Sequence, residues 1–236
     1  MHPDLDRFVA AATARGLPSE LSVNPSLLEP ELGRRLLEAG LRRLVCSLDG
    51  MDDATSTAIR GPAASYEKAA RNLDALLERV AQMKAPPVVV IQMLDLSRNA
   101  HQRTAFLARW GTTGLANVHA VVKDLGGDDP DLGRPTSTPT VFLCTYPWRS
   151  LTVLWDGRVV PCCHDDDGRL VLGDLKQQSL VEIWRGPKVA ELRVRHRSGQ
   201  LPAGHLCRDC GWRREKFAGA MRQRHPDRAR EHPYQW

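Results

Sequence analysis

The segment Pro86-Pro87-Val88-Val89-Val90-Ile91-Gln92-Met93 is the clearest structural signal in the sequence. Four β-branched residues in a row after a proline pair predict a strand, and an uninterrupted apolar run is typical of a strand buried on both faces. The segment Leu44-Val45-Cys46-Ser47-Leu48 has the same character and runs into a polar turn at Asp49-Gly50. Both segments predict strands of a parallel sheet, with Cys46 as a small core residue.

Helical patterns alternate with these strands along the first half of the chain. Apolar residues recur at intervals of three and four, and glycines close several of the segments. The predicted helices cover residues 3–15, 30–39, 65–83 and 99–110, and further strands cover residues 20–23 and 118–122. This alternation predicts an α/β class with four parallel strands covered by helices. A closed (β/α) barrel would need more strands before residue 1, so we expect either a partial barrel or an open four-stranded sheet.

Composition places the chain among ordinary globular proteins. Its 236 residues are 42% hydrophobic and 26% charged, which excludes a disordered or collagen-like chain. No apolar run reaches the roughly 20 residues of a membrane span. Met1-His2-Pro3-Asp4 lacks the basic segment and apolar core of a signal peptide. We therefore expect a cytoplasmic protein with no membrane partner, in which grouped cysteines bind metal or do redox chemistry.

The net charge of +5 does not favour nucleic acid as a partner. Residues 211–236 hold seven Lys and Arg against three acidic residues, so this end of the chain accounts for four of the five excess charges. Such a run is usually a solvated surface rather than a phosphate-binding one. We expect residues 213–236 to form a basic tail.

The pattern of residue types changes after residue 125. Residues 126–143 are rich in Gly, Asp, Pro and Thr and predict a linker. Beyond it, two short apolar runs flank Asp156-Gly157, a strong two-residue signal for a β-hairpin. Helices are predicted at about 178–185 and 187–197. A small, cysteine-rich α+β domain is therefore expected after an α/β domain of residues 1–125.

Five of the six cysteines lie in this second domain. Cys207 and Cys210 have the C-x-x-C spacing that lets one turn offer two thiolates to a metal centre, and the hairpin lets Cys162 return toward Cys144. Adjacent strand residues point to opposite faces, so only one of Cys162 and Cys163 is expected to be a ligand. Four thiolates from three segments suit either an iron–sulfur cluster or tetrahedral zinc.

The stretch Cys144-Thr-Tyr-Pro-Trp-Arg-Ser-Leu-Thr-Val-Leu-Trp-Asp-Gly-Arg-Val-Val-Pro-Cys-Cys163 closely resembles the SPASM domain that follows the barrel of radical S-adenosylmethionine (SAM) enzymes. That domain opens with a cysteine and later has Gly-x4-Cys, which Gly157 and Cys162 satisfy here. The segments 172–175 and 179–184 also resemble it. Because no cysteine follows Cys210, the resemblance implies a single auxiliary [4Fe–4S] cluster within residues 144–212, as in the shorter twitch-type variants. Its implied ligands are Cys144, Cys162, Cys207 and Cys210.

The resemblance extends back into the first half of the chain. Leu21-Ser-Val-Asn24-Pro25, Ser47-Leu-Asp-Gly50 and Ile59-Arg-Gly61 resemble motifs of the third strand, the fourth strand and the following loop of a radical SAM barrel. Polar groups at the carboxyl ends of parallel strands line the active face of such barrels. The resemblance therefore implies SAM contacts, for which the alternatives are helix capping, turn formation and pairing of the arginine with the aspartate. The implied contacts are Asn24, Ser47, Asp49 and Arg60.

Two motifs of the family are absent from the sequence. The C-x3-C-x2-C motif, which binds the SAM-cleaving cluster, and the second-strand Gly-Glu-Pro motif do not occur. Together with the strand count, their absence leads us to expect a partial radical SAM barrel whose first two strands are missing, from a truncated or mis-started reading frame.

The resemblance implies a radical SAM oxidoreductase that acts on a peptide or sugar-type substrate. It also allows for a reductant protein as a partner. This chain alone is not expected to cleave SAM. The alternative is a non-catalytic iron–sulfur or zinc-binding module. Near the metal site we expect Trp148 and Trp155 to pack against it, His164 to be a solvated loop residue, and Asp165-Asp166-Asp167 to form a solvated turn.

Overall fold

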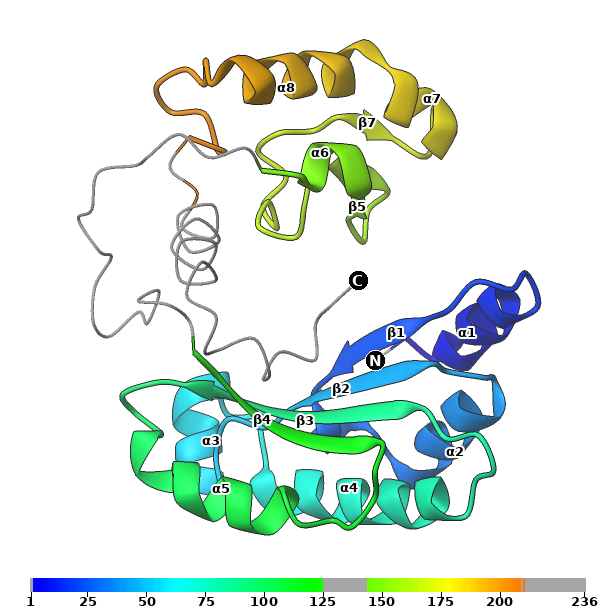
Figure 1. The fold of residues 1–236 in the computed structure, drawn as a ribbon, viewed down its shortest axis with the longest axis vertical. Coiled ribbons are helices and arrows are strands. Elements are labelled where there is room, and N and C mark those ends of the chain that lie inside the picture. Colours follow the sequence, from blue (N-terminus) through cyan, green and yellow to red (C-terminus); the bar gives the residue numbers. More distant parts are fainter. Residues whose placement is uncertain (1, 125–143, 209, 211–236) are drawn as a thin grey trace, which may run out of the picture. The chain divides into compact units, whose positions relative to one another are not determined.

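The computed structural model describes residues 2–124, 144–208 and 210, and only the backbone of Asp124. The chain divides into two compact units, Met1–Pro135 and Thr136–Trp236, which we call the N-terminal and C-terminal units (Figure 1). The predicted linker at 126–143 and the basic tail at 213–236 lie outside the described residues.

The N-terminal unit is built on a four-stranded parallel sheet in the order β1-β2-β3-β4. The strands are β1 (Glu20–Val23), β2 (Arg43–Ser47), β3 (Val88–Asp95) and β4 (Val118–Asp124). Chain order equals spatial order, as in a barrel wall, and each strand pairs in parallel with the next. The predicted α/β class with four parallel strands is confirmed.

The two faces of the sheet carry alternate residues of each strand. Cys46 and Ile91, neighbours across β2 and β3, enter the core beneath the helices. Figure 1 shows α2 (Pro30–Glu38), α4 (Tyr66–Ala81) and α5 (Arg103–Trp110) together on one side of the sheet. Val45 and Val90, one residue earlier in each strand, are also buried, but the period of two directs them to the opposite face.

The helices of this unit follow the predicted pattern with one addition. The predicted ones are α1 (Leu5–Thr13), α2 (Pro30–Glu38), α4 (Tyr66–Ala81) and α5 (Arg103–Trp110), and single 3-10 turns lie at η1 (Pro25–Leu27) and η2 (Ala100–Gln102). The addition, α3 (Asp53–Arg60), begins after Asp52, whose side chain accepts a hydrogen bond from the backbone N–H of Thr55 at 2.6 Å. Its sequence lacks a clear apolar face, so the capping aspartate was its main signal.

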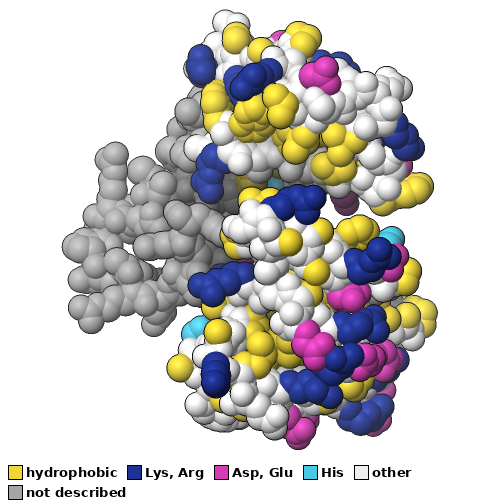
Figure 2. Space-filling view, turned by 90° about the vertical axis from the view of Figure 1, so that its right-hand side faces the viewer, with side chains coloured by type: hydrophobic (Ala, Val, Ile, Leu, Met, Phe, Trp, Pro, Cys, Tyr) yellow, Lys and Arg dark blue, Asp and Glu magenta, His cyan; other side chains and the backbone are white. Residues whose placement is uncertain are grey.

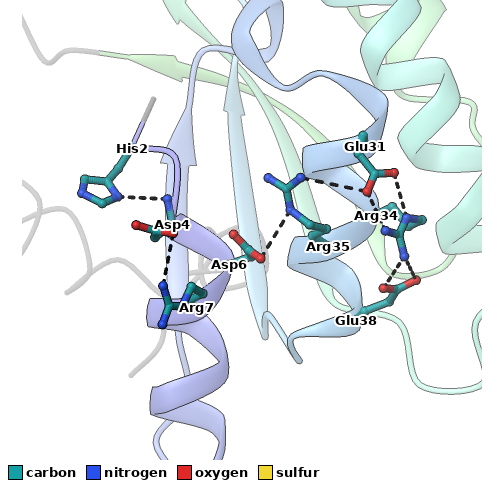
Figure 3. A network of polar contacts seen from close by, with 8 residues as sticks. All are labelled: His2, Asp4, Asp6, Arg7, Glu31, Arg34, Arg35 and Glu38. Carbon is teal, nitrogen blue, oxygen red and sulfur yellow. Dashed lines mark hydrogen bonds and ion pairs between the residues drawn. The ribbon is translucent and has the colours of Figure 1, made fainter.

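Charged side chains tie α1 to α2 at the surface (Figure 3). Arg35 on α2 lies 3.3 Å from the carboxylate of Asp6 on α1. Along α2, the guanidinium of Arg34 bridges Glu31 and Glu38, both at 2.5 Å. Exposed pairs of this kind contribute at most about 1 kcal/mol each, so the buried leucines of α2 hold it to the sheet.

The C-terminal unit is a small α+β domain, as predicted. Its antiparallel sheet has the order β5-β6-β7, from β5 (Thr152–Val153), β6 (Arg158–Val160) and β7 (Gly173–Asp174), and its helices are α6 (Tyr146–Arg149), α7 (Leu180–Arg185) and α8 (Pro187–Ser198). Gly157 takes a φ of 93° in the hairpin turn, a conformation that glycine adopts without strain. A core of five buried residues joins the sheet to α7 and α8, namely Val159, Leu172, Ile183, Val189 and Leu192.

Opposite charges are interspersed over the visible surface of the N-terminal unit, while apolar side chains are more frequent on that of the C-terminal unit (Figure 2). Among the described residues, none of the helices has the length and apolar character that a membrane crossing requires.

Candidate metal centre

Four cysteines line one pocket in the C-terminal unit. Cys144, Cys162, Cys207 and Cys210 contribute to its wall together with Tyr146, His164 and His196. All four are half-buried, whereas Cys163 is exposed and does not line this pocket. The structure thus brings together the four residues singled out as ligands, from three separate segments of chain.

The hairpin of β5 and β6 delivers Cys162 to the pocket. The carboxylate of Asp156 accepts hydrogen bonds from the backbone N–H and from Nε of Arg158, at 3.1 and 2.7 Å, which closes the turn. Val159 and Val160 are fully buried, and Val159 anchors β6 in the small core. Cys162 follows two residues later, and its position is therefore set by the packing of β6.

A buried aspartate fixes the loop after Cys162. Asp165 is 1% exposed, and its carboxylate accepts hydrogen bonds from the backbone N–H groups of Arg169 and Leu170 at 2.8 and 2.9 Å. Its own N–H donates to the carbonyl oxygen of Cys162 at 3.2 Å. The prediction of a solvated turn at 165–167 is wrong for Asp165, because its carboxylate is needed for the backbone donors of the loop.

Helix α8 is fastened to α6, which begins two residues after Cys144. Nε of Arg193 donates to the carbonyl oxygen of Pro147 at 2.9 Å. The ring of His196 meets the ring of Trp148 edge to face, with centroids 6.3 Å apart. After α8, the backbone N–H of Cys207 donates to Nδ1 of His205 at 3.1 Å. Packing and hydrogen bonds thus position the segments around Cys144 and Cys207.

One of the two tryptophans expected beside the pocket is not there. Trp148 contacts His196, which lines the pocket. Trp155 is 96% exposed, so the prediction is wrong for this residue. Trp155 lies in the hairpin turn beyond the end of β5 at Val153, where its side chain points to solvent. His164 is exposed, as expected, and it also lines the pocket.

The local electrostatics are unfavourable for the thiolates that metal binding needs. Burial raises the pKa of Cys162 to about 11, although a hydrogen bond from the backbone of His164 lowers it, and Cys163, Cys210 and Cys144 raise it further. The Cys162 thiol therefore holds its proton more tightly than a free cysteine does, until a positive ion compensates the charge of the thiolate.

The donor set fits an iron–sulfur group. Four sulfurs from three segments surround a half-buried pocket, and iron–sulfur clusters are held by four cysteine thiolates. In the part of the chain that the structure describes, no three His, Cys, Asp or Glu side chains form a group that could hold a metal ion.

The residues expected to contact SAM lie in the N-terminal unit. Asn24 caps η1, its Oδ1 accepting from the backbone N–H and the hydroxyl of Ser26 at 3.0 and 2.9 Å. Ser47 ends β2 opposite Gln92 of β3, on the sheet face that the helices do not cover.

Asp49 and Arg60 lie together. Asp49 is 2% exposed, accepts from the backbone N–H of Leu94 at 2.8 Å and pairs with a guanidinium nitrogen of Arg60 at 2.5 Å. Asn24 and Ser47 lie on other elements, at the N-terminal cap of η1 and at the end of β2.

Two buried amides that the sequence did not single out hold the loops at the ends of β2 and β3. Nδ2 of Asn99, a fully buried residue, donates to the carbonyl oxygens of Asp49 and Leu94, both at 2.9 Å. The side chain of Gln102 accepts from the backbone N–H of Met51 at 2.6 Å and donates to Asp52 at 2.5 Å. A polar segment directly after the strongest strand was the only sequence signal for these residues.

Comparison with known proteins assigns the C-terminal unit. Residues 144–211 match the model of SPASM, an iron–sulfur cluster-binding domain. An AdoMet-dependent heme synthase of Nitratidesulfovibrio vulgaris is 34% identical over 73 residues, which are 31% of this chain and 20% of that protein. An S-adenosyl-L-methionine-dependent 2-deoxy-scyllo-inosamine dehydrogenase of Niallia circulans is 26% identical over 76 residues, 32% of this chain and 30% of that protein. The matches thus span a third or less of these relatives.

Similarity of fold covers most of the chain. The crystal structure of BtrN in complex with AdoMet and 2-DOIA aligns with a TM-score of 0.52 and 18% identity over 88% of this chain and 66% of that one. The crystal structure of Streptococcus suis SuiB aligns with a TM-score of 0.52 and 11% identity over 81% of this chain and 54% of that one. At such identities the likeness concerns the fold alone. The chain therefore contains a SPASM domain at residues 144–211, and over most of its length it shares the fold of these solved structures.

Proposed function

We propose that the chain is part of a radical SAM oxidoreductase whose C-terminal unit holds one auxiliary [4Fe–4S] cluster. The proposed ligands are Cys144, Cys162, Cys207 and Cys210. The observation that carries the proposal is that these four residues line one pocket and all lie within the segment that matches an iron–sulfur cluster-binding domain.

The protein groups around the pocket hold its shape and limit access of water. The hairpin and the buried Asp165 set the segment of Cys162, and α8 holds that of Cys144 through Arg193. When bound, a cluster of this kind supplies a site for one-electron transfer. Four cysteine ligands leave none of four irons open, which favours electron transfer over direct anchoring of a substrate.

Residues of the N-terminal unit are proposed to shape the SAM site. Ser47 is the best placed of them, because it ends β2 on the sheet face free of helices. Asp49 and Arg60 pair with each other, so we propose that they hold the neighbouring loop and that Arg60, whose side chain is 29% exposed, can also meet a carboxylate. Asn24 is proposed to fix η1 beside the site through its cap.

One relative supports an oxidising reaction on a small molecule. One matching relative is named a dehydrogenase of 2-deoxy-scyllo-inosamine. Hydrogen abstraction from a sugar-type or peptide substrate, with an electron passed to the auxiliary cluster, is the reaction class we propose. A protein reductant and a cytoplasmic location remain part of the proposal.

Anaerobic reconstitution of the chain with iron and sulfide tests the ligand assignment. We expect about four irons per chain in the wild type, and loss of most of this iron in Cys207→Ala and Cys162→Ala. Cys163→Ala is the matched control, because its thiol is exposed and does not line the pocket, and it should keep the wild-type iron content. Equal iron in the Cys162 and Cys163 variants would contradict the proposed ligands.

A zinc-binding module is the second candidate function, since four thiolates also suit tetrahedral zinc. It predicts one colourless metal ion per chain after the same procedure, with no bound sulfide. The match to an iron–sulfur cluster-binding domain favours the first candidate.

A further inference from the structure

Helix α8 places a histidine where its buried face meets the cysteine pocket. Val189, Leu192 and His196 follow at intervals of three and four residues and are 1%, 3% and 2% exposed, so they share one face of the helix. Val189 and Leu192 belong to the apolar core, whereas His196 lines the pocket with the four cysteines. A buried imidazole costs free energy unless its nitrogens form hydrogen bonds. The neighbouring cysteine pocket therefore explains why a histidine stands at this position of the buried face.

Contacts from α6 hold the ring of His196. The ring of Trp148 meets the imidazole at an interplanar angle of 80°. The guanidinium of Arg197 in turn lies over the ring of Trp148, 5.6 Å from its centroid. The bond from Arg193 to the carbonyl oxygen of Pro147 fastens the same two helices. The position of the imidazole relative to the segment of Cys144 is therefore fixed by protein packing alone.

A buried imidazole beside sulfur ligands can act as a hydrogen-bond donor. Even when neutral, imidazole carries one N–H. Of the other two side chains in the pocket wall, His164 is exposed and Tyr146 is half-buried, so His196 is the most buried of the three. Hydrogen bonds to the sulfurs of a cluster stabilise its more negative, reduced state and raise its reduction potential.

We propose that His196 is a positioning residue that donates its imidazole N–H to a sulfur of the auxiliary cluster, either a bridging sulfide or a ligating thiolate. The inference rests on the proposed cluster in this pocket. Its consequence is a higher reduction potential of the cluster, which makes the cluster a better electron acceptor.

Potentiometric titration followed by electron paramagnetic resonance tests the inference on the reconstituted full chain. We expect His196→Leu to keep the iron and sulfide content and to shift the midpoint potential to a more negative value. His196→Gln, which restores an N–H donor, should recover part of this shift. His119→Leu makes the same chemical change on an exposed residue of β4 and should leave the potential unchanged.

Measurements on the wild type keep the inference testable even if a variant loses its cluster. With ¹⁵N-labelled histidine, the reduced cluster should show a weak nitrogen coupling and an exchangeable proton coupling that disappears in D₂O. An unchanged potential in His196→Leu, or no exchangeable proton and no histidine coupling in the wild type, would overturn the inference while leaving the cluster in place. A strong coupling of a directly bound nitrogen would also overturn it. A wild-type chain without any iron–sulfur cluster would instead defeat the proposed function on which the inference depends.

Discussion

At the residue scale, single buried polar groups fix both candidate sites. Asp49 joins β3 to the loop after β2 and pairs with Arg60, and Asp165 satisfies the backbone donors of the loop after Cys162. Each carboxylate accepts hydrogen bonds from backbone N–H groups of a neighbouring segment. Removal of either would leave buried donors without partners, which costs more than the interaction itself contributes.

The Asp49→Ala substitution should destabilise the N-terminal unit by about 2–3 kcal/mol, because it leaves the N–H of Leu94 and part of the Arg60 guanidinium without an acceptor. The matched control is Asp74→Ala, which breaks an exposed ion pair with Arg109 at 2.6 Å and should cost less than about 1 kcal/mol. Urea unfolding of the two variants measures the difference. Equal losses would show that Asp49 contributes no more than a surface residue.

The stability of the metal-free chain should fall at alkaline pH because of Cys162. Burial raises the pKa of this thiol from 9.0 to about 11, so the folded state holds the proton more tightly than the unfolded chain does. That contribution is complete below the unfolded pKa and is lost as the pH rises through the folded pKa. Between pH 9 and 11 the free energy of unfolding should therefore decrease more steeply for the wild type than for Cys162→Ala.

Two other cysteines affect how this pH experiment is interpreted. Cys163→Ala should flatten the slope less than Cys162→Ala does, because Cys163 makes only a secondary contribution to the raised pKa of Cys162, whose main cause is burial. Cys46 also has a raised pKa, to about 12, through burial, but it is present in all three proteins and cancels in the comparison. Identical slopes for the wild type and Cys162→Ala would contradict the assignment of this effect to Cys162.

At the element scale, the packing of α8 on α6 organises the pocket. One face of α8 supplies apolar residues to the core, and its last turn supplies His196. Arg193 contributes twice, through its bond to Pro147 and through its position 4.3 Å above the ring of Trp184.

Loss of Arg193 should therefore weaken the C-terminal unit. We expect Arg193→Ala to lower the free energy of unfolding by about 1–2 kcal/mol, the sum of one hydrogen bond and one cation–π contact. Arg195→Ala, two residues away, breaks only an exposed pair with Glu191 within the helix and should cost about 0.5 kcal/mol or less. Thermal unfolding followed by tryptophan fluorescence distinguishes them, and a smaller loss for the Arg193 variant would refute this role.

Elements with an apolar pattern or a turn signal could be predicted from the sequence, whereas β7 and α6 could not. Strands β1 and β4 begin at or next to the residues expected, because apolar runs bounded by turn residues carry their own signal. Strand β7 has two residues and no periodicity, and it exists because the N–H of Leu172 donates to Val159 at 2.8 Å. The four-residue α6 was missed for the same reason.

The residues of the candidate site likewise divide into those that the sequence predicted and those that it did not. The four cysteines could be chosen from spacing and resemblance, since a hairpin and a C-x-x-C turn determine their approach. His196 was not chosen, because a histidine in a helix gives no sign of what its face will meet. The exposure of Trp155 was missed because β5 ends at Val153, so that Trp155 belongs to the solvent-exposed turn of the hairpin.

At the scale of the whole molecule, the chain combines a parallel α/β unit with a SPASM domain. The printed sequence contains no C-x3-C-x2-C motif, and Cys46 is fully buried. We therefore expect the 236-residue chain, reconstituted with iron and sulfide and reduced, to form no 5′-deoxyadenosine from SAM. Chromatography of the reaction mixture checks this, and formation of the product above the level of a protein-free control would contradict it.

The central claim is that the C-terminal unit holds one four-iron cluster. Mössbauer spectroscopy of the full chain, loaded anaerobically with ⁵⁷Fe and sulfide, tests it most directly. The account predicts the diamagnetic quadrupole doublet of an oxidised [4Fe–4S] cluster, with about four irons and four sulfides per chain. A spectrum of isolated iron or of a two-iron cluster, or a chain that takes up one zinc and no sulfide, would contradict it.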